Sequence, residues 1–160
     1  MEMSENSRIW IYQANRPFSD EENKHAIQVL NDFTAGWHAH EHKLAAAAEI
    51  RYNRFIILMV DESVAGASGC SIDKLSKVIR ELEQEFKVNL FDRFNMAYKG
   101  GDEVISCSKE EFEKLLQEGV INDDTIVFNN TVQRKKELET SWEIPFSESW
   151  HPRFFQIHAS

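Results

Sequence analysis

A cysteine stands at the predicted entrance of a helix, and it is the residue of this chain best placed to do chemistry. The chain runs from the apolar segment 55–60 through the small-residue turn Gly66-Ala67-Ser68-Gly69 to Cys70 and an amphipathic stretch. The first turn of a helix has unpaired backbone N–H groups and a positive dipole end, which attract anions and lower the pKa of a thiol. The sequence therefore predicts a site at residues 66–73, without specifying a reaction.

Two interpretations of Cys70 stay open. As a nucleophile, Cys70 would attack an acyl or thioester carbon. His40 or His151 would then serve as the base, and Asp73 or Asn129 would orient that base. The other interpretation is a buried, inert thiol, because free cysteines often behave as small hydrophobic residues in protein cores. These residues do not decide whether the protein is an enzyme.

The function we expect from the same turn is binding of a small acidic ligand or of a protein partner. Backbone N–H groups at such a turn can hold a phosphate or carboxylate with little help from positive side chains. Arg153 is the natural side-chain partner of an acidic group. The alternative is an ordinary strand-to-helix turn capped by Ser71 or Asp73. The candidate ligand-binding residues are Gly69, Ser71, Asp73, Asn129, Asn130 and Arg153.

Half of the six histidines lie in the segment Trp37-His38-Ala39-His40-Glu41-His42. In an extended chain the alternate histidines would project to one side, whereas in a helix only His38 and His42 would share a face. Either arrangement could offer nitrogen ligands to zinc. A solvated turn after the first helix is the more ordinary explanation, so we expect no metal and no cofactor.

Composition limits the partners. The formal net charge of −9 disfavours nucleic acids, because their non-specific binding depends on lysines and arginines that neutralise phosphates. The short basic run Arg134-Lys135-Lys136 is interpreted as a solvated helix face. Two cysteines, a polar N-terminal segment and the absence of a long apolar stretch lead us to expect a soluble, cytoplasmic protein without membrane insertion.

The elements that must position these residues alternate between strand and helix patterns. A capping-box pair, Ser19 and Glu22, opens a helix that ends near Gly36. The segment 44–52 is ambiguous, and we interpret its second half as a strand. The apolar run 55–60 predicts a central strand, and it ends at Asp61 and Glu62, which could do acid–base work or simply end the strand in water. Further elements are predicted for a strand at 8–13 and a helix at 72–86.

The second half of the chain adds a hairpin, a helix and a strand. The hairpin strands 94–98 and 103–107 are joined through Gly100-Gly101, and Ser108 with Glu111 opens a third helix. A last strand is predicted at 125–128, followed by an irregular aromatic tail from residue 140, which could dock a partner protein.

The predicted fold is a single α+β domain over residues 1–160. Its mixed or antiparallel sheet has a ferredoxin-like β-α-β-β-α-β core, extended by the hairpin, the third helix and the tail.

Several short pieces of the chain carry a resemblance that covers nearly its whole length. The pieces are Trp10-Ile11-Tyr12-Gln13 with Asn15-Arg16, Trp37 with His40, Tyr52-Asn53-Arg54-Phe55-Ile56, Gly69-Cys70-Ser71-Ile72-Asp73, Val127-Phe128-Asn129-Asn130, and Glu148-Ser149-Trp150-His151 with Arg153-Phe154-Phe155. Together they resemble an uncharacterised family of short bacterial proteins sometimes labelled ABC transporter ATPases. The resemblance implies no established activity, and the label conflicts with this chain, which lacks the glycine-lysine-serine or -threonine ending of a Walker motif.

Overall fold

Helices and antiparallel sheets combine in this chain, so the predicted α+β class is confirmed. The computed structural model describes residues 3–155. They fall into two compact units, one made of residues 3–92 with 133–136 and the other of 93–132 with 137–155. A single domain over 1–160 stays a prediction, and each unit is described by itself. Within residues 3–155, no helix is both long and apolar enough to cross a membrane.

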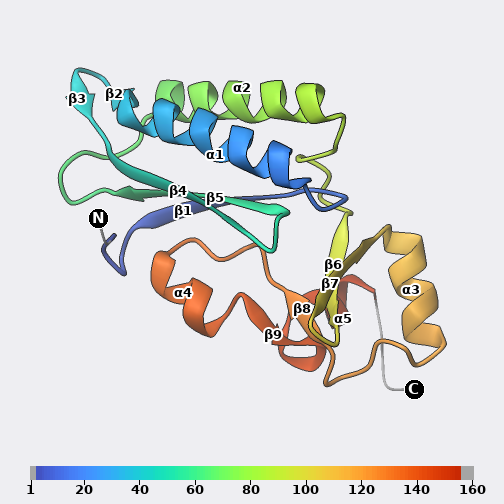
Figure 1. Cartoon of the computed structure of the whole chain (residues 1–160). Coiled ribbons are helices and arrows are strands. Elements are labelled where there is room, and N and C mark those ends of the chain that lie inside the picture. The colour runs from blue at the N-terminus through green and yellow to red at the C-terminus, as the bar shows by residue number, and fades with distance from the viewer. Residues whose placement is uncertain (1–2, 156–160) are drawn as a thin grey trace. The chain divides into compact units, whose positions relative to one another are not determined.

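The first unit is built on a three-stranded antiparallel sheet in the order β1-β5-β4. Two long helices, α1 and α2, lie on the same face of this sheet (Figure 1). Its elements are β1 (Arg8–Gln13), α1 (Asp20–Ala35), β2 (His38–Ala39), β3 (His42–Lys43), β4 (Ala45–Arg51), β5 (Phe55–Asp61) and α2 (Gly69–Phe86).

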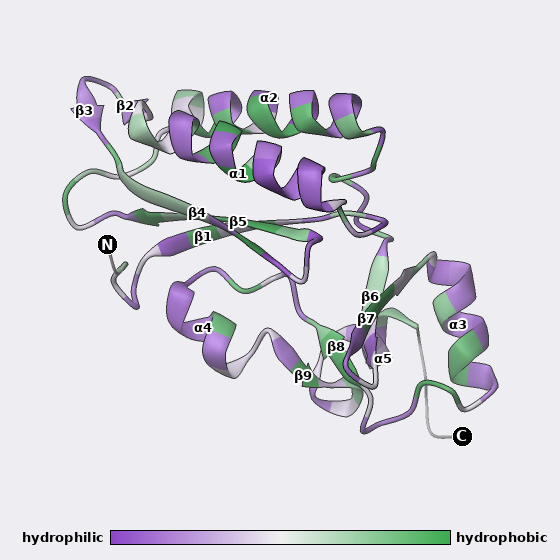
Figure 2. Cartoon of the chain, viewed as in Figure 1, coloured by the Kyte–Doolittle hydropathy of each residue, from purple (hydrophilic) through white to green (hydrophobic). Residues whose placement is uncertain are grey.

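β5 is the central strand, as its continuous apolar run predicts. Every residue from Phe55 to Val60 is buried, and Figure 2 shows the strand as predominantly hydrophobic. Ile56, Leu58 and Val60 alternate along β5 and join the core between sheet and helices. The helices contribute the apolar stripes predicted for them, including Leu30 from α1.

β4 includes the four alanines whose secondary structure was ambiguous from the sequence. Ala45–Ala48 has high helix propensity, yet the strand runs from Ala45 to Arg51 because it pairs with β5 along its whole length. Ala45 lies opposite Asp61, and Arg51 lies opposite Phe55. Tertiary pairing has therefore overridden local propensity.

The ferredoxin-like core is not confirmed. The strand expected at 94–98 begins at Met96 and belongs to a separate sheet, so it does not complete the sheet of the first unit. Beside β1, the first unit has only an isolated antiparallel bridge between Arg8 and Arg134. The prediction assumed that strands follow one another into one sheet, which local patterns cannot establish.

The second unit has a four-stranded antiparallel sheet in the order β7-β6-β8-β9. The predicted hairpin forms, with its turn at Gly101, where φ is +68°. Ser108 and Glu111 form the predicted capping box of α3. The elements are β6 (Met96–Gly100), β7 (Glu103–Cys107), α3 (Lys109–Gln117), β8 (Ile126–Phe128), β9 (Glu143–Pro145), η1 (Phe146–Glu148) and α5 (His151–Phe154), and α4 (Lys135–Thr140) begins in the first unit and ends in this one.

The aromatic C-terminal region is more regular than predicted. It supplies the edge strand β9 and two short helices, and Trp142, Phe146 and His151 are buried. Phe112 of α3 packs against Phe146 and Phe155 at ring-centroid distances of 6.1 and 4.9 Å. Much of the tail therefore builds the core of the second unit.

Candidate functional site

The entrance of α2 is capped one residue before the helix begins. Ser68 Oγ accepts a hydrogen bond from Ser71 N–H, and Ser71 Oγ accepts one from Ser68 N–H, which forms a reciprocal capping box. The cap is thus Ser68, and the expectation of Ser71 or Asp73 as cap is wrong, since the helix starts earlier, at Gly69. Within residues 3–155, the N–H groups of Gly69 and Cys70 have no hydrogen-bond acceptor.

Cys70 lies exposed in this first turn, so the interpretation as a buried thiol is wrong. The exposed thiol stands beside the two unpaired amides. Among residues 3–155, no hydrogen bond joins its sulfur to a histidine or a carboxylate. Asp73 lies exposed one turn further along α2. The catalytic roles remain predictions.

Trp37 also holds the first turn of α2 in place. Its indole Nε1 donates to the carbonyl oxygen of Ser71 at 2.8 Å, and both residues are buried. Trp37 also contacts the rings of Trp10 and Phe33 at centroid distances of 5.9 and 5.0 Å. This buried anchor fixes the first turn of α2 against α1 and β1.

Glu62 organises the loop that leads to the entrance. Its Oε2 accepts a hydrogen bond from Ala67 N–H at 3.0 Å and lies 3.8 Å from Arg8 Nη1. Its Oε1 lies 3.8 Å from Arg134 Nη1. A β-carbon on Gly66 would meet Oε2 at 3.3 Å, so glycine leaves the room that this carboxylate occupies.

Asp61 is engaged within its own turn. Its Oδ1 accepts hydrogen bonds from the Ser63 hydroxyl at 2.7 Å and from Ser63 N–H at 3.0 Å. These two bonds hold the pKa of the Asp61 carboxyl below its ordinary value. The contacts favour a turn-closing role for Asp61 over acid–base work.

The histidine segment folds into a tight hairpin. Ala39 pairs with His42 and His38 pairs with Lys43, so His38 and His42 lie on opposite faces. His40 occupies the two-residue turn with a φ of +55°. No group of three or more potential ligands capable of holding a metal ion occurs among residues 3–155.

The remaining predicted residues lie in the second unit. Asn129 Nδ2 donates to Ser141 O at 3.2 Å, and Asn130 Oδ1 accepts from Trp142 Nε1 at 2.9 Å, so both amides hold the region around β8 and β9. His151 is buried, and burial lowers its pKa to about 4. Arg153 is exposed on α5. Their ligand-binding and catalytic roles stay predictions.

Two arginines near the loop were missed by sequence reasoning. Arg8 begins β1, and Arg134 pairs with it through the isolated bridge. Arg134 belongs to the run interpreted as a helix face; Lys135 and Lys136 do begin α4, and the run also pairs with the N-terminal segment. There Lys135 N–H donates to Ser7 O, and Lys136 N–H donates to Glu5 O. No local pattern could have signalled this pairing, since it joins distant parts of the sequence.

Comparisons of the chain with protein-family models, with curated proteins and with solved structures found no match. The resemblance to the family of short bacterial proteins therefore stays a prediction.

Proposed function

We propose that the entrance of α2 binds a small acidic molecule. Two neighbouring backbone N–H groups, those of Gly69 and Cys70, lie in the first turn without an acceptor from the described chain. Such groups, together with the positive end of the helix dipole, favour an anion. The helix is long, running over 18 residues, so its dipole is fully developed.

The observation that carries the proposal is the pair of guanidinium groups around Glu62. Arg8 and Arg134 approach one carboxylate, whose Oε2 also accepts the N–H of Ala67, two residues before Gly69. This carboxylate therefore contacts the kinds of donor that an incoming acid would use. At 3.8 Å both ion pairs are longer than a charge-assisted hydrogen bond of about 2.8 Å, so we expect Glu62 to be displaceable.

Open space at Gly69 supports access to the amides. A β-carbon built on Gly69 would meet no atom within 4 Å. Glycine at this position is therefore not required by packing, and the exposed Cys70 lies next to it. The space beside Gly69 therefore leaves room for an acidic group near these amides.

The arginine pair also supports a finer interpretation of the fold. We infer that the first unit is a ferredoxin-like core whose last strand is reduced to the bridge beside β1. The order β1-β5-β4 with α1 and α2 on one face is consistent with it, as is the hydrogen bond from Ile9 N–H to Gln133 O at 3.1 Å. Slow hydrogen exchange of the Ile9 amide would support this pairing, and fast exchange would contradict it.

The proposal is tested by titrating the ¹⁵N-labelled protein with malonate and with inorganic phosphate at constant ionic strength. We expect the amide signals of Gly69 and Cys70 to shift in a saturable way. Arg8→Gln should weaken binding about fivefold to tenfold, because one charge-assisted contact is lost. Glu62→Gln should tighten it, because the competing carboxylate becomes a neutral amide.

Arg80→Gln is the matched control. This arginine belongs to α2 but lies over the Phe91 ring at 5.1 Å, so its loss should leave the anion affinity unchanged. Amide signals of Gly69 and Cys70 that move with neither anion would refute the proposal. An affinity insensitive to both Arg8→Gln and Glu62→Gln would refute it too.

A further inference from the structure

The outer edge of β4 is an unpaired strand edge, separate from the proposed anion site at the entrance of α2. β4 pairs with β5 along one edge, and within residues 3–155 no strand pairs with the other edge of β4. All seven residues of β4 are partly exposed. An open edge offers N–H and C=O groups to which another extended segment can pair.

The first four residues of this edge lack the usual protection against pairing. Protected edges have lysines, prolines or bulges, whereas β4 begins with the four alanines Ala45–Ala48. Charges come only later in the strand, where Arg51 Nε pairs with Glu49 Oε1 at 3.0 Å. The unprotected stretch is long enough to pair with a short peptide.

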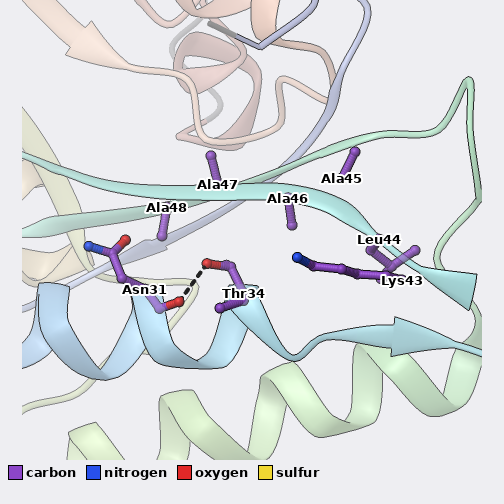
Figure 3. Close-up of a pocket in the computed structure, with 9 residues that line it drawn as sticks. Asn31, Thr34, Lys43, Leu44, Ala45, Ala46, Ala47 and Ala48 are labelled. Atoms are coloured by element: carbon purple, nitrogen blue, oxygen red, sulfur yellow. Dashed lines mark hydrogen bonds between the residues drawn. The ribbon is translucent and has the colours of Figure 1, made fainter. Parts of the chain in front are cut away.

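A hollow of about 530 Å³ lies between this stretch and α1. Asn31, Thr34 and Ala35 line it from the helix. Figure 3 shows Ala46 and Ala48 pointing toward α1, and Ala45 and Ala47 pointing away. Because the alanines end at Cβ, the space above them is unfilled, and its size is within the range of ligand pockets.

Lys43 supplies the only charge among the residues that line the hollow. Its side chain extends along the hollow toward Thr34 (Figure 3). No carboxylate of the described chain forms an ion pair with this ammonium. The hollow therefore combines an unpaired strand edge, room for large side chains and one positive charge.

We propose that an extended peptide with acidic and bulky apolar residues at alternate positions adds to β4 as a fourth strand. Its backbone pairs with the edge, its apolar side chains fill the hollow, and a carboxylate meets Lys43. This binding surface is additional to the anion site at the entrance of α2.

A second copy of this chain fits the edge less well. Its own β4 would bring alanines to the hollow, which would leave the space unfilled. Each copy also has a net charge of −9, so two copies repel one another. An acidic peptide has fewer charges to repel, and its carboxylate has Lys43 to contact.

The test uses the capped heptapeptide Asp-Thr-Leu-Thr-Leu-Thr-Asp, which presents the same side chains in either strand direction. Binding of the dye-labelled peptide to the whole protein is followed by fluorescence anisotropy, and hydrogen exchange reports the amides of residues 45–51. We expect saturable binding with slower exchange along this edge. Replacing both leucines by alanine, or both aspartates by lysine, should weaken binding at least tenfold.

Two pairs of variants separate the edge from other surfaces. Lys43→Glu should weaken binding of the acidic peptide at least tenfold and strengthen binding of the lysine peptide. Lys77→Glu, an exposed change on α2, should do neither. Ala48→Phe should fill the hollow and block peptide binding. Ala45→Phe should not block it, because the side chain at position 45 points away from the hollow. Circular dichroism confirms that each variant is folded.

Three results would overturn the inference. One is equal binding by the acidic and lysine peptides, or no binding of either. Another is an equal effect of Lys43→Glu and Lys77→Glu. The third is a dimer in sedimentation whose amides at residues 45–51 are protected without peptide, because a second copy would then occupy the edge.

Discussion

Acidification should destabilise the second unit through His151. His151 is 1% exposed, and its ring stacks on Trp150 with a centroid distance of 3.9 Å and an interplanar angle of 15°. Its Nδ1 lies 2.9 Å from Ser149 Oγ. Since that hydroxyl donates its single proton to Phe146 O at 2.7 Å, it accepts from Nδ1–H. A second proton would have to enter at Nε2, on a ring surrounded by aromatic side chains.

The magnitude follows from the pKa. Burial lowers the pKa of His151 from its ordinary value of 6.5 to about 4. Between these values the unfolded chain holds a proton that the folded protein does not, so the free energy of unfolding falls as the pH falls. The stability is fully present above pH 6.5 and is lost down to about pH 4. At 1.36 kcal/mol for each pH unit, the loss amounts to about 3 kcal/mol.

Denaturant unfolding at a series of pH values between 7.5 and 4 measures this loss, and an NMR titration of the imidazole signals measures the pKa directly. His151→Phe keeps an aromatic ring and removes the titrating group. Over this pH range its free energy of unfolding should therefore fall by about 3 kcal/mol less than that of the wild type. His42→Gln, an exposed change in the hairpin, is the control and should match the wild type. A folded-state pKa near 6.5, or parallel profiles for wild type and His151→Phe, would refute the reasoning.

Two further predictions concern the loop and the first turn of α2. Gly66→Val should lower the free energy of unfolding by about 1 kcal/mol, because its Cβ crowds Glu62 Oε2 and breaks the hydrogen bond to Ala67. In urea unfolding, Gly69→Ala, where a Cβ meets no atom within 4 Å, should change stability by less than about 0.5 kcal/mol, and equal losses would contradict this account. Iodoacetamide at neutral pH should alkylate the exposed Cys70 well before Cys107, because burial raises the pKa of Cys107 to about 11. Cys70→Ser should therefore remove the fast phase of alkylation. A fast phase that persists in this variant would contradict its assignment to Cys70.

Local patterns predicted the local structure well. Ser19 with Glu22 and Ser108 with Glu111 form the capping boxes that their spacing indicated. The apolar run 55–60 is the buried central strand, and the stripe in 72–86 is the inner face of α2. These features depend on residues a few positions apart, so the sequence contains enough information to predict them.

The sheet assignments failed where pairing is distant in sequence. The strand beginning at Met96 alternates as a strand should, yet its pattern does not say which sheet it joins. The same reason explains Ala45–Ala48, where pairing with β5 outweighed a helix preference of a few tenths of a kcal/mol per residue. The pattern within one segment therefore predicts the conformation of that segment better than it predicts which strands the segment will pair with.

The candidate site shows what this difference means for function. The thiol, the glycines and the helix entrance lie within one short segment, so the sequence could place them together. The charges that favour an acid come from Arg8 and Arg134, which one bridge brings side by side from opposite ends of the chain. Arg153, chosen for its charge alone, lies in the other unit. The positive side chains were therefore invisible to sequence reasoning, and the Arg8→Gln and Glu62→Gln titrations test the part of the proposal that only the structure supports.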